Sequence, residues 1–120
     1  MYFEIDNYNA LKDALNTLCT GLRQRDIPQD TVYDSKLVAD ELLSNALRHG
    51  GGKAFFSVEL NGDSISISVK SLQAFRPPDE SILVSREAES GRGLYLVDTI
   101  VETRRYSEDR GTSVVIRIRK

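Results

Sequence analysis

Hydrophobic residues recur with two different periods along the chain, and the change of period separates a helical part from a sheet part. Before residue 50 the apolar positions lie three and four residues apart, which is typical of amphipathic helices. This spacing predicts a first helix that begins at Asn7 or Asn9 and runs to about Arg25. Pro28, which suits the first position of a helix, marks a second helix that runs to about His49.

After the glycines at 50–52 the apolar period becomes two, as expected for strands with one buried face. Two such runs, at residues 55–60 and 64–69, are separated by Asn61-Gly62, which is a strong signal for a β-hairpin. Residues 2–6 are expected to form a short edge strand. Residues 103–106 and 112–119 are expected to form a closing hairpin.

The order of these elements predicts an α+β fold in one domain over residues 1–120. We expect a two-layer α/β sandwich, with the helices on one face of a mixed, largely antiparallel sheet. Residues 72–90 contain Pro77-Pro78 and read as a long loop, a kind of segment that often acts as a lid or binding loop. The glycines at 91 and 93 are expected to open a helix that runs to about Val101.

Composition excludes several classes of function. Sixteen basic and eighteen acidic residues give a net charge of −2, which does not favour nucleic acid or an anionic membrane as the main partner. One cysteine and one histidine exclude an intrachain disulfide and a Cys/His metal site. The chain has neither a signal peptide nor an apolar run of the ~20 residues that a membrane span requires, so a cytoplasmic location is expected.

The second predicted helix carries a polar ridge. Glu41, Asn45 and His49 follow one another at intervals of four residues, while most of the remaining helix surface is apolar. An asparagine oxygen suits Mg²⁺, and a glutamate one turn earlier is placed to accept a proton from a hydroxyl that attacks a phosphate. The alternative is a solvent-facing ridge, in which His49 simply caps the end of the helix.

A glycine-rich segment precedes the third predicted helix. Gly91 and Gly93 would let the backbone approach a ligand closely, and the following helix presents unpaired N–H groups to an anion. Arg92 could add positive charge or point to solvent. An ordinary loop that enters a helix is the alternative, and Gly111-Thr112 reads by default as a turn.

Taken in order, these segments resemble the GHKL ATPase/kinase superfamily with its Bergerat nucleotide-binding fold, in particular its small anti-sigma-factor serine kinases. The resemblance covers nearly the whole chain and rests on residues 38–51, 91–97 and 111–112. It implies a histidine-kinase-like ATPase fold, a homodimer, and ATP and Mg²⁺ as cofactors. Asn45 would hold Mg²⁺ and Glu41 would be the general base. The residues expected to bind the nucleotide are Asn45, His49, Ser71, Gly91, Arg92, Gly93, Leu94 and Thr112, with residues 72–90 as the ATP lid.

One segment departs from the pattern of this superfamily. After the strand that ends near Val69 the family has an aspartate that reads the adenine amino group, followed shortly by a glycine. Here Ser71 and Gln73 stand at these two positions. A serine hydroxyl can accept one hydrogen bond but lacks the charge that strengthens it, and the loss could weaken adenine binding by roughly 1.5–3 kcal/mol. Leu72, Gln73 and Phe75 could also fill the pocket.

Two hypotheses for the function follow. The first is an anti-sigma factor with ATP-dependent serine kinase activity on an anti-anti-sigma (STAS-type) protein, and with a sigma factor as its second partner. The second is a nucleotide-independent protein-binding module of the same fold that has lost strong ATP binding. Glu41 and Asn45 favour the first hypothesis, and Ser71 and Gln73 favour the second, so the sequence leaves enzymatic activity open.

Overall fold

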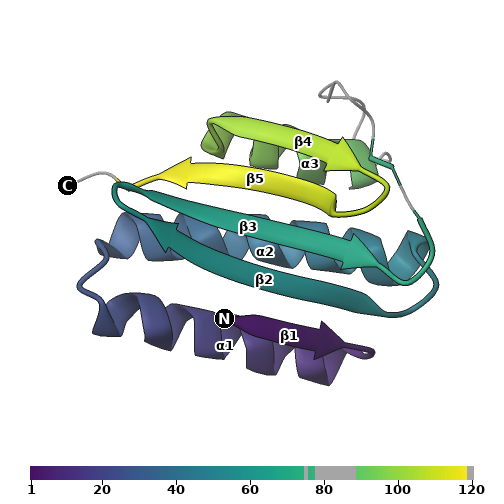
Figure 1. Cartoon of the computed structure of the whole chain (residues 1–120), viewed down its shortest axis with the longest axis horizontal. Helices are drawn as coiled ribbons and strands as arrows, with labels where there is room; N and C mark the ends of the chain where they lie inside the picture. Colours follow the sequence, from purple (N-terminus) through teal and green to yellow (C-terminus); the bar gives the residue numbers. More distant parts are fainter. Residues whose placement is uncertain (75, 78–88, 119–120) are drawn as a thin grey trace.

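The computed structural model describes residues 1–74, 76–77 and 89–118, with residues 89–92 described as backbone only. This part of the chain forms a five-stranded sheet and three helices (Figure 1). The elements in chain order are β1 (Tyr2–Ile5), α1 (Tyr8–Gln24), α2 (Gln29–His49), β2 (Ala54–Asn61), β3 (Ser64–Ser71), α3 (Glu89–Ile100), β4 (Thr103–Ser107) and β5 (Gly111–Arg117).

The strands lie in the order β1-β2-β3-β5-β4, and each neighbouring pair is antiparallel. The three helices lie behind the sheet in Figure 1 and leave its other face open. The predicted α+β sandwich with helices on one face is therefore confirmed, and every pairing among the described strands is antiparallel. No helix in the described ranges is long and apolar enough to cross a membrane.

The core lies between the sheet and the helices. Alternate residues of the strands are buried, because successive side chains of a strand point to opposite faces. The core residues of β2, β3 and β5 are Ala54, Phe56, Val58, Ile65, Ile67, Val69, Val114 and Ile116. They share one hydrophobic cluster with apolar residues of all three helices, so the period-two pattern predicted which face of each strand is buried.

Local signals fix where several elements begin. The side chain of Asn7 accepts a hydrogen bond from the backbone N–H of Ala10 at 2.8 Å, so Asn7 rather than Asn9 is the N-cap of α1. Pro28 lies one residue earlier than predicted, in the capping position before α2. The β2–β3 hairpin turns at residues 62–63, and Gly62 has a φ of 60°, as expected for a glycine in the first central position of a type II′ turn.

Four chain segments meet at one end of the sheet. α2 and β3 end there, and α3 and β5 begin there, at the right-hand side of Figure 1. Gly111 opens β5 with a φ of 73°, and a Cβ atom at this position would collide with the carbonyl oxygen of Val69 on β3. Glycine therefore allows β5 to begin directly against the end of β3.

Candidate functional site

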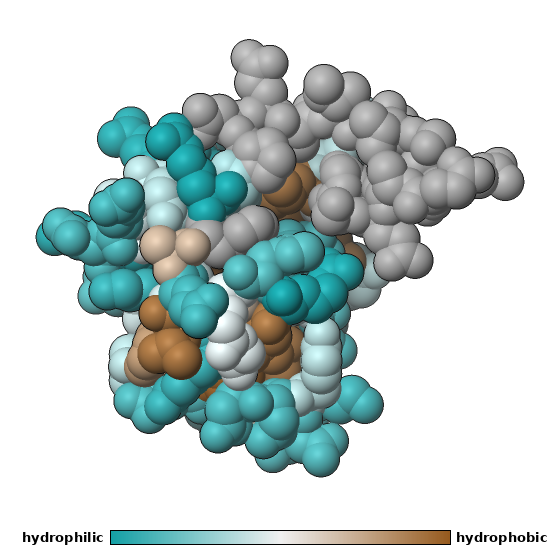
Figure 2. All heavy atoms as spheres, turned by 90° about the vertical axis from the view of Figure 1, so that its right-hand side faces the viewer, coloured by the Kyte–Doolittle hydropathy of each residue, from teal (hydrophilic) through white to brown (hydrophobic). Residues whose placement is uncertain are grey.

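A cavity opens at this end of the molecule, between α2 and the ends of three strands. It contains about 650 Å³ of empty space, a figure that includes the solvent in its open mouth. Figure 2 looks onto this end, where hydrophobic residues are visible between polar ones. The lining residues are Leu42, Asn45, Ala46, Val69, Lys70, Ser71, Leu72, Ala74, Pro77, Tyr106, Glu108, Gly111 and Thr112.

Asn45 lies at the cavity wall and is held at both ends of its side-chain amide. Its Nδ2 donates a hydrogen bond to Oε1 of Glu41 at 3.2 Å, and its Oδ1 accepts one from Nη2 of Arg48 at 2.7 Å. Asn45 is only 4% exposed, so the solvent-facing alternative is wrong for this residue. The three side chains form a continuous polar chain along α2, because residues three and four apart are neighbours on a helix.

Glu41 is half-buried next to α3, and desolvation by this burial raises the pKa of its carboxyl group above the ordinary value. The hydrogen bond from Asn45 and the charge of Arg48 oppose this shift, but burial has the larger effect. A Cβ atom on Gly93 would collide with the Glu41 carboxylate, so a glycine is what lets α3 pack this closely. A carboxylate of raised pKa beside a cavity is a candidate general base.

Ser71 lies at the end of β3, where its hydroxyl group donates a hydrogen bond to the carbonyl oxygen of Gln73. The backbone N–H of Gln73 in turn donates to the carbonyl oxygen of Gly50 at 2.8 Å, which ties this turn to the end of α2. Because the hydroxyl hydrogen is used inside the protein, only the lone pairs of Ser71 are left for a ligand. Ser71 can therefore accept a hydrogen bond from a ligand amino group.

Thr112 reaches the same cavity from β5. It is 5% exposed and lies opposite Val69 in the β3–β5 register. The strand order thus places Thr112 in one cavity with Asn45 and Ser71, although the three residues come from separate segments of the chain.

A protein-family model matches almost the whole length of the chain. Residues 6–118 match the family described as the histidine kinase-like ATPase domain. The chain belongs to this family. A comparison with curated proteins found no match. The sequence-based prediction of the superfamily and of its fold is thereby confirmed.

Other predicted residues of the ATPase domain lie outside the described cavity lining. His49 is exposed at the last position of α2. Gly91 and Arg92 belong to α3, which begins at Glu89 rather than at the glycines, and the side chain of Arg92 is outside the described part. Leu94 is buried in the core, so any contact with a phosphate would come from its backbone.

The predicted obstruction of the cavity by residues 72–75 is only partly seen. Leu72 contributes to the lining but is 58% exposed, and Gln73 is not among the lining residues described. Phe75 and most of the predicted ATP lid, residues 78–88, lie outside the described residues. The cavity of the ATPase domain is open in the part of the chain that can be described.

Sequence reasoning missed Arg48 and the contribution of β4 to the cavity. Arg48 follows Asn45 by three residues, a spacing that could have indicated the contact. Tyr106 reaches the cavity because β4 pairs with β5, where Tyr106 lies opposite Thr112. The β4–β5 hairpin was predicted, but nothing in the local sequence predicts that β5 pairs with β3, which brings this hairpin to the cavity.

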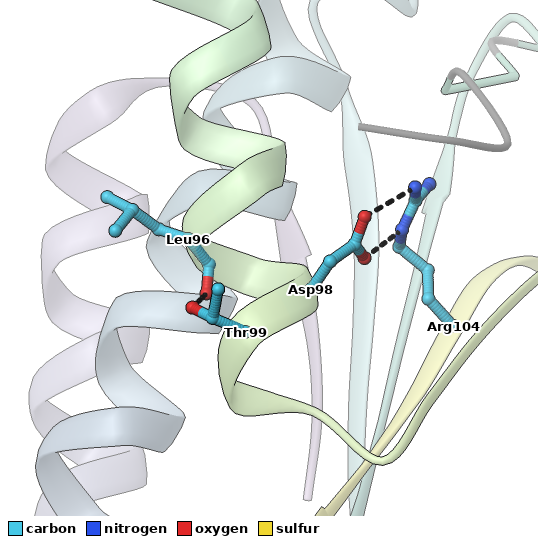
Figure 3. Close-up of polar contacts among 4 residues, drawn as sticks. All are labelled: Leu96, Asp98, Thr99 and Arg104. Carbon is cyan, nitrogen blue, oxygen red and sulfur yellow. Dashed lines mark hydrogen bonds and ion pairs between the residues drawn. The ribbon is translucent and has the colours of Figure 1, made fainter. Parts of the chain in front are cut away.

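α3 is fastened to the sheet by an ion pair next to its C-terminal turn (Figure 3). Nε of Arg104 on β4 lies 2.6 Å from Oδ1 of Asp98, and its second nitrogen, Nη2, lies 3.0 Å from Oδ2. The Arg104 side chain is 9% exposed, so the pair is poorly screened by solvent. The two parallel bonds link the C-terminal part of α3 to β4 in a defined geometry.

The residues of the cavity fit a magnesium–nucleotide complex better than a metal ion alone. Within the described residues no group of three or more His, Cys, Asp or Glu side chains could hold a metal ion. Oδ1 of Asn45 is an oxygen atom held in place by its hydrogen bond from Arg48. Mg²⁺ usually takes one or two protein ligands and completes its shell with phosphates and water, so one such oxygen is sufficient.

Proposed function

We propose that this chain is a cytoplasmic partner-switching regulator of bacterial transcription, an anti-sigma factor with ATP-dependent serine kinase activity on an anti-anti-sigma (STAS-type) protein. The observation that carries the proposal is the convergence of Asn45, Ser71 and Thr112 on one cavity with Glu41 beside it. Membership of the histidine kinase-like ATPase family supports nucleotide binding. The resemblance of the motifs to small anti-sigma-factor kinases supports the choice of partners.

The cavity suits a purine ring at its inner end. Leu42, Ala46 and Val69 supply apolar walls, and Ser71 supplies an acceptor for the adenine amino group. A neutral acceptor forms a weaker hydrogen bond than a carboxylate, so we expect micromolar rather than tighter affinity. Thr112 adds a second hydroxyl group at the cavity wall.

In the proposed reaction the serine hydroxyl oxygen of the partner protein attacks the γ-phosphorus, and the bond from this phosphorus to the bridging oxygen of the ADP leaving group breaks. Glu41 accepts the proton of the serine hydroxyl group. Its raised pKa makes it a better proton acceptor near neutral pH, and Asn45 fixes the orientation of its carboxylate. Mg²⁺, when bound at Asn45, neutralises charge on the phosphates.

The experiment that tests the proposal is calorimetric titration of the protein with Mg-ATP, run beside the Asn45→Ala variant. Micromolar binding that Asn45→Ala weakens would support a nucleotide site. A kinase assay with candidate STAS-type proteins then compares the wild type with Glu41→Ala, which should lose phosphate transfer while its circular dichroism stays unchanged. Unchanged transfer would remove Glu41 from the role of base.

The alternative is a nucleotide-independent protein-binding module of the same fold. Ser71 in place of the family's aspartate is the observation that favours it. No detectable binding at millimolar Mg-ATP would support this alternative and would direct the search to contacts with a sigma factor. Homodimerisation is part of either proposal, and sedimentation as a monomer at high concentration would contradict it.

A further inference from the structure

Arg48 occupies the oxygen atom that the site offers to a metal ion. Its guanidinium group donates to Oδ1 of Asn45 at 2.7 Å, while the other end of the same amide donates to Glu41 at 3.2 Å. Asn45 is buried, whereas Arg48 is exposed. An exposed arginine therefore donates a hydrogen bond to a buried oxygen atom.

The two neighbours of Asn45 allow only one orientation of its amide. A reversed amide would bring its NH₂ group against the donors of Arg48 and its oxygen against the carboxylate of Glu41. Both contacts would be repulsive, so Oδ1 stays directed toward the cation. The two hydrogen bonds thus orient Oδ1 of Asn45, and the one from Arg48 also occupies this oxygen.

We propose that Arg48 is a built-in cation that competes with the divalent metal ion for Oδ1 of Asn45, an inference that rests on the proposed role of this site in binding Mg-nucleotide. Two cations at one oxygen repel each other, so metal binding requires Arg48 to leave. The long side chain of Arg48 can swing into solvent, because the residue is exposed at the end of α2. Arg48 is then a positioning residue that holds Asn45 in the ligand-free protein and lowers its apparent affinity for metal.

The competition has a measurable size. A hydrogen bond to a charged group is stronger than a neutral one, but solvent screening at an exposed arginine weakens it. We therefore expect removal of the Arg48 side chain to tighten metal binding roughly three- to tenfold. Lysine at the same position keeps the charge but loses the planar fork of donors, so Arg48→Lys should lie between the wild type and Arg48→Ala.

The test measures the Kd of the protein for a non-hydrolysable ATP analogue with and without Mn²⁺ by calorimetric titration, and the ratio of the two values reports metal binding at the site. Arg48→Ala should bind Mn²⁺ more tightly than the wild type by the factor given above. Arg105→Ala is the matched control, because Arg105 is an exposed arginine on β4 outside the cavity lining and its loss changes the net charge equally. Unchanged or weaker Mn²⁺ binding by Arg48→Ala would overturn the inference, and so would an equal gain in Arg105→Ala.

A second measurement separates failure of this inference from failure of the proposed function. If the analogue does not bind the wild type even without metal, the nucleotide site itself is absent. The contact is then read directly from the side-chain amide signals of Asn45 in nuclear magnetic resonance spectra of the ligand-free protein. These signals should shift in Arg48→Ala because the amide oxygen loses its donor, whereas signals unchanged from the wild type would overturn the inference.

Discussion

Replacement of Ser71 by aspartate tests how a nucleotide would be recognised in the cavity. The lone pairs of Ser71 can accept one neutral hydrogen bond, worth about 0.5–1.5 kcal/mol, whereas a carboxylate would accept a charge-assisted bond worth about 1.5–3 kcal/mol. The difference of about 1–1.5 kcal/mol corresponds to a five- to tenfold lower Kd for Mg-ATP. A gain of about a hundredfold would mean that Ser71 makes no bond to the nucleotide at all.

The same substitution should destabilise the ligand-free protein. The hydroxyl group of Ser71 donates to the carbonyl oxygen of Gln73, and an ionised aspartate cannot donate. Loss of this bond should lower the free energy of unfolding by about 0.5–1.5 kcal/mol, which is a decrease in Tm of a few degrees. Tighter binding and a lower Tm are therefore expected in one variant.

Calorimetric titration and thermal unfolding measure the two effects on the same samples. Ser66→Asp is a suitable control, because it adds an equal charge on the open face of β3, away from the cavity. Its Kd for Mg-ATP should match that of the wild type. Unchanged affinity in Ser71→Asp would refute the assignment of Ser71 to the adenine amino group.

Three further predictions concern the contacts of α3 and Glu41. Glu41→Gln should stabilise the protein at neutral pH, because burial raises the pKa of Glu41 and the folded state loses stability as pH rises from the ordinary to the raised pKa. Urea unfolding at pH 4 and pH 7 should show a higher free energy of unfolding for the variant only at pH 7. Gly93→Ala should displace the Glu41 carboxylate and reduce phosphate transfer at least tenfold. The better helix propensity of alanine, worth about 1 kcal/mol, should offset part of the steric cost in stability. Phosphate transfer at the wild-type rate would contradict the close packing of Gly93 against Glu41. Arg104→Ala should lower the free energy of unfolding by about 2 kcal/mol, a value between those of exposed and buried ion pairs. A loss below about 0.5 kcal/mol would show that the ion pair with Asp98 does not stabilise the packing of α3.

The fold was predictable because each element carries its own local signal. The period of two in β2 and β3 predicted the buried face of each strand, and the glycines after residue 49 predicted the end of α2. These signals depend on which face of an element meets the core, and a sequence records this directly. The same reasoning predicted that Glu41 and Asn45 share one face of a helix, and their hydrogen bond confirms it.

The rest of the site depends on contacts between elements, which local patterns do not record. Tyr106 enters the cavity because β5 of the predicted β4–β5 hairpin pairs with β3, and no local pattern indicates that pairing. The start of α3 was predicted at its glycines, but the helix includes them, because Gly93 serves close packing against Glu41 rather than a loop conformation. Both features follow from how the elements meet.

Two residues that lower the stability of the fold lie at this end of the sheet. A glycine inside α3 costs about 1 kcal/mol relative to alanine, and a half-buried carboxylate is held where its charged form is disfavoured. Glu41→Gln would relieve the second cost, whereas Gly93→Ala would place a Cβ atom against the Glu41 carboxylate. Glu41 in turn contacts Asn45 of the cavity wall. Local costs that cluster beside a cavity, while the remaining core follows regular patterns, are typical of a site kept for function rather than for stability. This contrast supports the proposed phosphate-transfer site over the proposed binding module, because contacts with a protein alone gain nothing from a half-buried carboxylate.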